Sequence, residues 1–370
     1  MIIDIHCHYT FTRRQAQPGE RFSFEPAEEN GRVALDSFVA PRKLRRPAWR
    51  LAKRFFGIDP RLPPGPGFDT RLAELYHPHL FNTGPVDRIV LLALDAYHDD
   101  DGQRVPPPET RRQPGSDIYT SNSLVLQTCR EHPQRFLFGA SVHPYRENAT
   151  ACIEEVFTRG ACLLKWLPLH QNIDISDPRT LAVLRCCARL GLPVLAHYGE
   201  EFMLTTHRAE FRSVAPLLDV LRQLRREHAM PTTIVAHIAT PATPFGERRS
   251  HALLLNALLG EFARAPLFAD ISAFTSWGKA GYLRRTARRQ ALHPKLLFGS
   301  DFPVPLALPR LRRTRPHEHA DARAQRSWIQ QAVRIYRNAG YNEIIFHHAA
   351  QLLPHVDHFS HPPAGDGPPA

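Results

Sequence analysis

Long hydrophobic runs are missing from this chain of 370 residues. The apolar stretch IVLLALDAY at 89–97 is too short to cross a membrane, and it carries Asp95. The amino terminus also lacks the basic start and apolar run that a secretory signal needs. These absences argue against an integral membrane segment and against secretion, so we expect a cytoplasmic location.

Cysteine is scarce and shows no pairing pattern. The six cysteines form no C-x-x-C motif, and Cys186 and Cys187 are adjacent in a segment expected to be helical. A disulfide framework is not expected in a chain of this length with 43% hydrophobic residues. We predict reduced thiols, mostly in the core.

Lysine is rare, occurring only at positions 43, 53, 165, 279 and 295, so arginine carries almost all of the net charge of +11. The densest basic segment, PRKLRRPAWRLAKRFF at 41–56, contains no acidic residue. Such a patch can bind a membrane surface or nucleic acid, but no zinc-finger spacing or RNA-binding motif accompanies it. We interpret it as a solvated insertion and predict no nucleic-acid partner.

Short apolar runs alternate with longer amphipathic segments, which is typical of βα units around a parallel sheet. Eight strands are predicted, at 1–7, 88–94, 136–142, 161–167, 193–197, 232–237, 267–272 and 295–300. Eight such units predict an α/β fold of the (β/α)₈ TIM-type barrel class. An open doubly wound sheet is the alternative, but its Gly-rich phosphate fingerprint is absent after the first strand.

Helices are predicted between these strands, at 116–132, 178–190, 209–228, 247–264, 278–292, 325–339 and 342–353. Ser116 and Asp117 are good N-cap residues for the first of them. The second has Asp177 as N-cap and Pro178 at its first position, and Gly191 follows its last residue.

Three segments do not follow this alternation. Residues about 12–68 form a long insertion after strand one, residues 98–115 form a loop at the catalytic rim, and the carboxyl-terminal HPPAGDGPPA is predicted to be disordered. We expect a barrel domain at 1–355 and a tail at 356–370. The insertion is too apolar for a free loop, so it is predicted to pack over the barrel mouth or against a second subunit of a homo-oligomer. Its apolar side chains are Leu44, Trp49, Leu51, Phe55 and Phe56.

The opening sequence MIIDIHCHYT places two histidines two residues apart. Because side chains alternate along a strand, Asp4, His6 and His8 are expected on one face, with Ile3, Ile5 and Cys7 on the other. Both imidazoles would project from the end of a buried strand towards the same point. That is the geometry of a metal site, although one strand cannot complete it.

Other predicted strands also end in metal-binding or acid–base side chains. In such barrels the chemistry lies at the carboxyl ends of the strands, so these residues are expected to meet at one rim. They are His6 and His8 on strand one, Lys165 on strand four, His197 on strand five, His237 on strand six and Asp301 after strand eight.

Residues that follow these strand ends are predicted to line the substrate pocket. They are His143, Trp166, Gln171, Tyr198 and Glu200, with Glu201 beside the last. Asp4 and Asp270 are expected either to orient a neighbouring ligand or to cap backbone groups.

These motifs resemble the amidohydrolase superfamily, and in particular the amidohydrolase-related branch that also holds non-oxidative decarboxylases. The resemblance covers about 1–12 and 86–353 and leaves the insertion out. The motifs that carry it are DIHCH at 4–8, LLKWLPLHQ at 163–171, LPVLAHYGEE at 192–201, IVAHIA at 234–239 and LFGSDFP at 297–303.

The resemblance implies that His6, His8 and His197 bind a divalent metal. It also implies that Asp301 handles the proton of the bound water, and that His237 either ligates a second metal or polarises the substrate. Imidazole and carboxylate ligands suit zinc, with manganese or iron as alternatives. One or two ions are expected, and a bound metal brings the pKa of water to about 7.

Lys165 has three interpretations. In the family that it resembles, members with a lysine on strand four can carry it as a carbamate that bridges two metals. Alternatively, its ammonium anchors a substrate carboxylate, or it has a structural role. Arginine would not serve as a carbamate, because a guanidinium stays protonated.

Three functions remain open. A metal-dependent hydrolase would attack an amide, lactone or ester carbonyl of a small, carboxylated molecule, with Asp301, His237 and Lys165 as catalytic residues. A non-oxidative decarboxylase would use the same site to protonate carbon. A degenerate, ligand-binding barrel is the third reading, but the complete set of candidate ligands argues against it. We favour the hydrolase.

Overall fold

A computed structural model describes residues 1–29, 31–46, 49, 53–54, 56–110, 112–200, 204–206, 208–243 and 246–358. Its central sheet has eight parallel strands, one for each strand predicted from the sequence. In sheet order they are β1 (Ile3–His8), β6 (Arg88–Leu92), β8 (Phe136–Ala140), β9 (Ala161–Trp166), β10 (Val194–Ala196), β11 (Thr233–Val235), β12 (Leu267–Asp270) and β13 (Leu296–Leu297).

The last strand returns to the first and closes the barrel. The amide of Ile5 donates to the carbonyl of Phe298 at 3.2 Å, and that of His8 donates to the carbonyl of Phe302 at 2.7 Å. Apolar side chains from all eight strands fill the interior, and Leu353 and Ala349 join this cluster from the carboxyl-terminal segment. The expected TIM-type barrel is confirmed.

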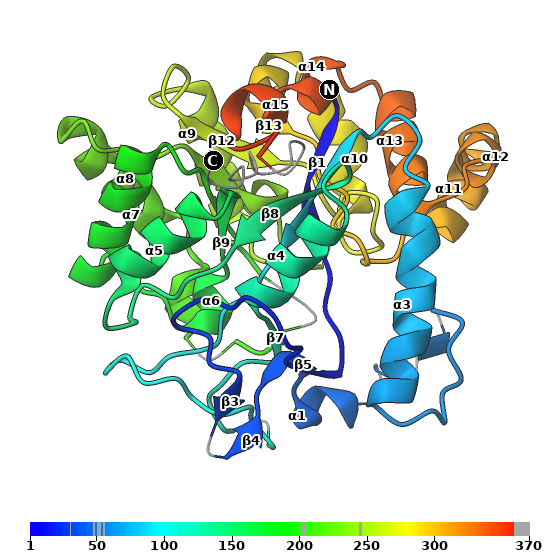
Figure 1. Ribbon diagram of the computed structural model, residues 1–370. Helices are drawn as coiled ribbons and strands as arrows, with labels where there is room; N and C mark the ends of the chain where they lie inside the picture. Colours follow the sequence, from blue (N-terminus) through cyan, green and yellow to red (C-terminus); the bar gives the residue numbers. More distant parts are fainter. Residues whose placement is uncertain are drawn as a thin grey trace, which may run out of the picture.

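The helices pack around this barrel (Figure 1). They are α1 (Pro41–Leu44), α3 (Pro66–Phe81), α4 (Asn122–Glu131), α5 (Ala149–Thr158), α6 (Pro168–Gln171), α7 (Pro178–Leu190), α8 (Ala215–Arg226), α9 (Arg249–Leu259), α10 (Ala280–Ala287), α11 (Leu308–Thr314), α12 (Pro316–Arg323), α13 (Trp328–Ala339), α14 (Ile344–His347) and α15 (Ala349–Leu352). Short 3₁₀ segments lie at η1 (Ala209–Arg212), η2 (Ala236–Ala239) and η3 (Gln290–Lys295). None of the helices in the described part of the chain is both long and apolar enough to cross a membrane.

Helix α7 has the bounds that the sequence predicts. The Asp177 side chain accepts from the amide of Arg179, and Gly191 ends the helix with φ 65°. Helix α4 differs, because it begins only after Ser121, whose hydroxyl accepts from the amide of Leu124. The predicted caps Ser116 and Asp117 are used elsewhere, since they bind groups of neighbouring loops.

Strand β1 departs from regular alternation. Its pairing with β6 shifts by one residue between Asp4 and Cys7, which is a β-bulge. Ile3 and Ile5 pack inside the barrel, whereas Cys7 packs in the outer core. The prediction that the side chains of residues 3, 5 and 7 share one face is therefore wrong, and the bulge is the reason.

The segment after β1 is rich in short strands and lies at the end of the barrel where β1 finishes (Figure 1). β5 (Leu35–Val39) pairs antiparallel with β2 (Arg13–Gln15) and with β7 (Ile118–Thr120), which follows β6 in the chain. A hairpin joins β3 (Glu28–Glu29) to β4 (Arg32–Val33). The expected boundary at residue 68 is slightly late, because α3 already begins at Pro66.

Buried ionic contacts join this insertion to the barrel. The carboxylate of Glu25 accepts from the amides of Asn122 and Ser123 at 2.8 Å each, at the start of α4. Arg42 Nε donates to Asp117 at 2.6 Å, and the same carboxylate accepts from the amide of Thr205 in the loop after β10. The insertion is therefore part of the packed rim.

Where they are described, apolar side chains of the insertion pack against helices α3 and α13, and packing over the mouth or against a second subunit stays a prediction. Trp49 lies against Phe68 of α3, with ring centroids 5.5 Å apart, and Phe56 lies 6.1 Å from Trp328 of α13. Leu51 and Phe55 lie outside the described residues, as does most of the predicted tail.

Candidate metal centre

The bulge in β1 brings His6 to the inside of the barrel end, next to strand β12. His6 Nδ1 lies 2.8 Å from Asp270 Oδ2 and 3.0 Å from Ser272 Oγ. A carboxylate accepts only, so Nδ1 carries the proton and the lone pair of His6 is at Nε2. Asp270 thus orients Nε2 towards the barrel mouth.

His237 follows β11 in an unusual backbone turn. His237, Ile238 and Ala239 all have positive φ, at 53°, 51° and 48°. Such backbone is costly for residues with a Cβ, and it persists where surrounding contacts hold it. Here the amide of His237 donates to Asp270 Oδ1 at 2.8 Å, and His237 Nδ1 donates to the Ser272 carbonyl at 3.0 Å. His237 Nε2 therefore also carries a lone pair.

Two overlapping groups of side chains have the composition of a metal site. The inner one consists of His6, His237 and Asp270. The hydroxyl oxygen of Ser272 lies 3.0 Å from His6 Nδ1, 2.8 Å from His237 Nδ1 and 2.5 Å from Asp270 Oδ1. This oxygen already occupies the centre of the inner group, so the inner group does not fit an ion.

The outer group consists of His6, His8 and Asp301 and faces the mouth. Asp301 Oδ1 lies 3.3 Å from His8 Nε2 and 3.5 Å from His6 Nε2. Two ligands about 2.0–2.1 Å from a tetrahedral zinc ion are separated by about 3.3 Å, so these distances fit one ion. His8 is the most accessible of the three, with 18% of its side chain exposed.

The remaining predicted ligands lie around this outer group. Lys165 is fully buried, and its Nζ lies 3.1 Å from His6 Nε2. His237 Nε2 lies 3.8 Å from Asp301 Oδ2, and the ring of His197 lies 5.0 Å from that of His237. The barrel therefore brings all six predicted residues to one end.

Burial governs the charge of the imidazoles. It lowers the pKa of His6, His197 and His237 well below 6.5, and the positive charge of Lys165 lowers all three further. The three rings are neutral near pH 7. Neutral imidazole is the form that binds metal.

Asp4, one of the two expected supporting carboxylates, caps backbone groups. Its Oδ1 accepts from the amide of Ser300 at 2.9 Å and from that of His6 at 3.2 Å. Asp4 thereby joins strand β1, which carries His6 and His8, to Ser300, the residue before Asp301. Burial raises the pKa of Asp4 to about 7.

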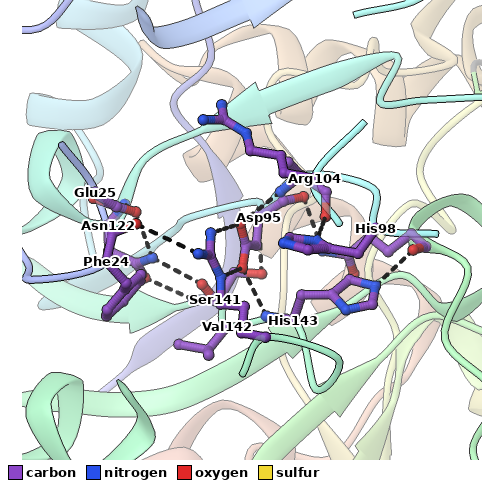
Figure 2. A network of polar contacts seen from close by, with 12 residues as sticks. Phe24, Glu25, Asp95, His98, Arg104, Asn122, Ser141, Val142 and His143 are labelled. Atoms are coloured by element: carbon purple, nitrogen blue, oxygen red, sulfur yellow. Dashed lines mark hydrogen bonds and ion pairs between the residues drawn. The ribbon is translucent and has the colours of Figure 1, made fainter. Parts of the chain in front are cut away.

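Two of the predicted substrate-binding residues, His143 and Gln171, lie in a buried polar network. Figure 2 shows the part of it around His143 and Asp95. His143 Nε2 donates to the Gln171 carbonyl at 2.7 Å, and its Nδ1 accepts from the amide of Tyr145. The side-chain amide of Gln171 binds the amide of Leu167 and the carbonyl of Asp95. Both side chains are occupied by contacts within the protein.

The centre of this network is the buried pair of Asp95 and Arg146. Arg146 donates to both carboxylate oxygens, at 2.7 and 2.8 Å, and the amide of His143 donates to Asp95 at 2.7 Å. The rings of His98 and His143 lie 4.4 Å apart beside it (Figure 2). The network joins the loops that follow β6, β8 and β9.

The other three predicted pocket residues lie apart from the outer group. Trp166 packs in the outer core, and its Nε1 donates to the Val142 carbonyl at 2.8 Å. Tyr198 is buried in the same core, and its hydroxyl has no hydrogen-bond partner among the described residues. Glu200 pairs with Arg212 at 3.1 Å, and Glu201 lies outside the described residues.

Sequence reasoning missed the role of Ser272 and the pairing of Asp95 with Arg146. Ser272 ends the predicted strand LFADIS, two residues after Asp270, so the same alternation that selected other strand-end residues also reaches it. Serine is not a common metal ligand, so a pattern of metal-binding side chains does not include it. Its contribution is to hold two imidazoles rather than an ion.

Comparison with known proteins identifies the family. The sequence profile described as amidohydrolase matches residues 110–331, which is more than half of the chain. The chain belongs to the amidohydrolase family. No curated protein sequence matches it.

Solved structures of similar fold include an uncharacterised TIM-barrel protein from Bordetella bronchiseptica, with a TM-score of 0.56, 15% identity and coverage of 95% of this chain and 96% of that one. A probable 2-pyrone-4,6-dicarboxylic acid hydrolase from Acinetobacter baumannii has a TM-score of 0.45 and 13% identity over 97% and 98% of the two chains. A 5-carboxyvanillate decarboxylase from Sphingomonas paucimobilis has a TM-score of 0.48 and 16% identity, with coverage of 94% of this chain and 97% of that one. The first of these supports the barrel assignment.

The buried imidazoles predict that acid destabilises the metal-free protein. Burial holds the pKa of four of them well below 6.5, namely His6, His143, His197 and His237. Their contribution to stability is present above pH 6.5 and is lost as the pH falls, because only the unfolded chain then takes up protons. Asp4 and Glu25 act in the opposite direction, since burial raises their pKa values.

A net uptake of two or more protons on unfolding lowers the free energy of unfolding by about 3 kcal/mol per pH unit between about pH 6 and pH 5. Urea unfolding curves at pH 7.5, 6.0 and 5.5 measure this slope. An unfolding free energy that stays constant over this interval would show that the imidazoles are not kept neutral by the fold.

Proposed function

We propose that this chain is a metal-dependent hydrolase that cleaves an amide, lactone or ester bond of a small, carboxylated molecule. The observation that carries the proposal is the outer group, in which Asp301 Oδ1 lies 3.3 and 3.5 Å from two imidazole nitrogens at the carboxyl end of the barrel. Membership of the amidohydrolase family supports it.

His6, His8 and Asp301 would hold the ion, and their donor set favours zinc over manganese or iron. His197, His237 and Lys165 are the further candidate ligands around it. When bound, such an ion acts as a Lewis acid, which lowers the pKa of water and polarises a carbonyl. The protein supplies the orientation of the donors, because Asp270 and Ser272 hold the Nδ1 atoms of His6 and His237.

Asp301 and His237 are the proposed acid–base pair. Asp301 Oδ2 and His237 Nε2 lie 3.8 Å apart, and both are acceptors in this structure. A proton taken up at Asp301 can pass to His237 Nε2 and from there to the leaving group. Burial of the pair keeps bulk water from competing for that proton.

Lys165 is the third proposed catalytic residue. Its Nζ donates towards His6 Nε2, which is the atom that the metal would also use. Metal binding therefore requires that Lys165 move away, lose its proton or be modified. A carbamate on Lys165 would satisfy this requirement and add an anionic ligand, whereas an ammonium that moves away would bind substrate.

The test is to load the purified protein with zinc and incubate it with panels of lactones, amides and hydroxybenzoates. We expect release of acid from a lactone or an amide, without release of carbon dioxide, and loss of turnover after chelation. Carbon dioxide from a hydroxybenzoate would contradict the hydrolase and support a decarboxylase. The same protein after chelation and reloading with zinc serves as the control for irreversible damage.

A further inference from the structure

The start of helix α9 carries positive charge where a helix favours negative charge. Arg248 is the N-cap residue, Arg249 is the first residue of the helix, and the first turn contains no acidic residue. Glu247 supplies one carboxylate, which accepts from the amide of Arg249. The amides of Ser250 and His251 donate to no group that the structure describes. This helix end therefore offers two N–H donors and an excess of positive charge.

Helix α10 adds two arginines that are exposed to solvent. Arg285 lies in its last turn, and Arg289 lies just after its end. Neither forms an ion pair with a described residue, whereas the neighbouring Arg284 pairs with Glu318 of α12. The charges of Arg285 and Arg289 can therefore meet an anion from solution.

Two buried polar side chains connect the two helices. Tyr282 of α10 and His251 of α9 pack edge to face, with ring centroids 4.9 Å apart. The guanidinium carbon of Arg285 lies 5.6 Å from the centre of the Tyr282 ring. The hydroxyl of Tyr282 is buried and has no hydrogen-bond partner among the described residues. A buried hydroxyl without a partner is costly, so a bound group that completes it would stabilise the protein.

The electrostatics of these two side chains shows that the arginines are close to both. Burial raises the pKa of Tyr282, and the positive charges of Arg248 and Arg285 partly offset that rise. Burial lowers the pKa of His251, and the positive charges of Arg289 and Arg285 lower it further. Arginines from two helices thus act on one buried pair.

A phosphate group matches this combination of donors. N–H groups at the start of a helix bind phosphate oxygens, and the helix dipole favours their negative charge. A guanidinium group offers a planar pair of N–H donors that fits two of these oxygens. A carboxylate has only two oxygens and one charge, so it would leave more of the donors and more of the positive charge unmatched.

We propose that the start of α9, together with Arg285, Arg289 and the hydroxyl of Tyr282, forms a binding site for a phosphate group. The phosphate is either the free ion or part of a small phosphate ester. The site uses none of the candidate metal ligands, so the inference does not depend on the proposed hydrolase activity.

The site is joined to the turn that carries His237. His251 Nδ1 lies 2.9 Å from the carbonyl oxygen of Ile238 and carries the proton, because a carbonyl only accepts. Ile238 is one of the residues that hold this turn at positive φ. A phosphate at the start of α9 is therefore connected to the backbone of the candidate metal centre through one side chain.

The decisive variant, Arg285→Gln/Arg289→Gln, removes two charges from the protein surface. Its matched control is Arg225→Gln/Arg226→Gln, which removes two exposed arginines from the last turn of α8. Helix α8 ends before β11 begins, and α9 starts after β11 ends, so the control lies at the opposite end of the barrel. Tyr282→Phe is a second test, because it removes only the hydroxyl.

The experiment follows the backbone amide signals of the isotope-labelled full chain by NMR while inorganic phosphate or phenyl phosphate is added at constant ionic strength. We expect the amides of Ser250 and His251 to shift most. The phosphate concentration at half-saturation should rise at least about tenfold in Arg285→Gln/Arg289→Gln and about threefold in Tyr282→Phe, and stay unchanged in the control. The probe with the lower half-saturation identifies the source of the phosphate group as the ion or an ester.

Thermal unfolding identifies the variants that fold, and acetate at the same ionic strength measures general attraction of anions. An unchanged half-saturation in either folded variant overturns the inference. It is also overturned if the amides of Ser250 and His251 do not shift, if acetate shifts them as much as phosphate does, or if the control weakens binding equally.

Discussion

Asp301→Asn is expected to lower the affinity for zinc by at least about a hundredfold and to lower turnover of the metal-dependent reaction by about 10²–10⁴-fold. The physical reason is that Asp301 supplies the only carboxylate of the outer group, between His6 Nε2 and His8 Nε2. Asparagine keeps the shape but loses the charge and the ability to take up a proton. Competition titration with a chelator and elemental analysis measure the first effect, and steady-state kinetics measure the second.

Asp219→Asn is the control, because Asp219 is exposed on α8 and, among the residues that the structure describes, its ion pair is with Arg222 of the same helix. A full equivalent of zinc bound with unchanged affinity by Asp301→Asn would contradict the assignment of the outer group.

Lys165→Ala, measured by the same titration and elemental analysis, separates the interpretations of Lys165. Two equivalents that fall to one support a bridging carbamate, whereas one equivalent in both proteins removes that hypothesis.

Arg146→Met is expected to reduce the free energy of unfolding by about 3–5 kcal/mol at pH 7, although Arg146 touches none of the candidate ligands. The side chain of Asp95 is completely buried. Burial opposes ionisation of Asp95, but the guanidinium of Arg146 outweighs it and holds the carboxyl pKa below its ordinary value. Without Arg146, the network that joins three loops of the mouth retains a buried and unpaired carboxylate.

The sign of the pH effect follows from the same contact. A lowered carboxyl pKa contributes stability above the pKa of the unfolded chain and loses it in acid, so the difference between wild type and Arg146→Met should be largest at neutral pH. Denaturant unfolding at pH 7 and at about pH 3, below the carboxyl pKa of the unfolded chain, measures it. Arg71→Met breaks an exposed pair with Glu74 and should cost less than about 1 kcal/mol. Equal losses of unfolding free energy in Arg146→Met and Arg71→Met would show that the buried ion pair stabilises the fold no more than the exposed one.

The eight strands and the residues at their ends were predictable from the sequence, because both follow from local patterns. Each strand is a short apolar run, and a His, Lys or Asp closes most of those on which the site depends. Helix α7 was predictable to the residue because Asp177, Pro178 and Gly191 act within the helix itself. Closure of a barrel then brings distant strand ends together without further information.

The features that escaped prediction depend on contacts between distant residues. Ser116 and Asp117 have the composition of a helix cap, but Tyr97, Arg42 and Thr205 bind them first. The short strands of the insertion are defined by their partners, since β5 pairs with β7 more than 75 residues later in the chain. None of these pairings leaves a periodic signal.

The same limit applies to the candidate site. His143 and Gln171 follow strand ends, as the candidate ligands do, yet the structure engages both in the network around Asp95. Nothing in the local sequence distinguishes a histidine that faces the mouth from one that supports a loop. Ser272 acts through an oxygen placed between three side chains from different strands, which only the assembled barrel defines.

The bulge in β1 allows one strand to place both its isoleucines and its two histidines on the inner side of the barrel. Perfect alternation would offer the barrel either the isoleucines at 3 and 5 or the histidines at 6 and 8, but never both sets. Without the bulge, a strand that kept Ile3 and Ile5 inside the barrel would turn the rings of His6 and His8, two candidate ligands, away from the mouth. A change of backbone register at this one point would therefore displace two candidate ligands and leave the hydrophobic interior of the barrel intact.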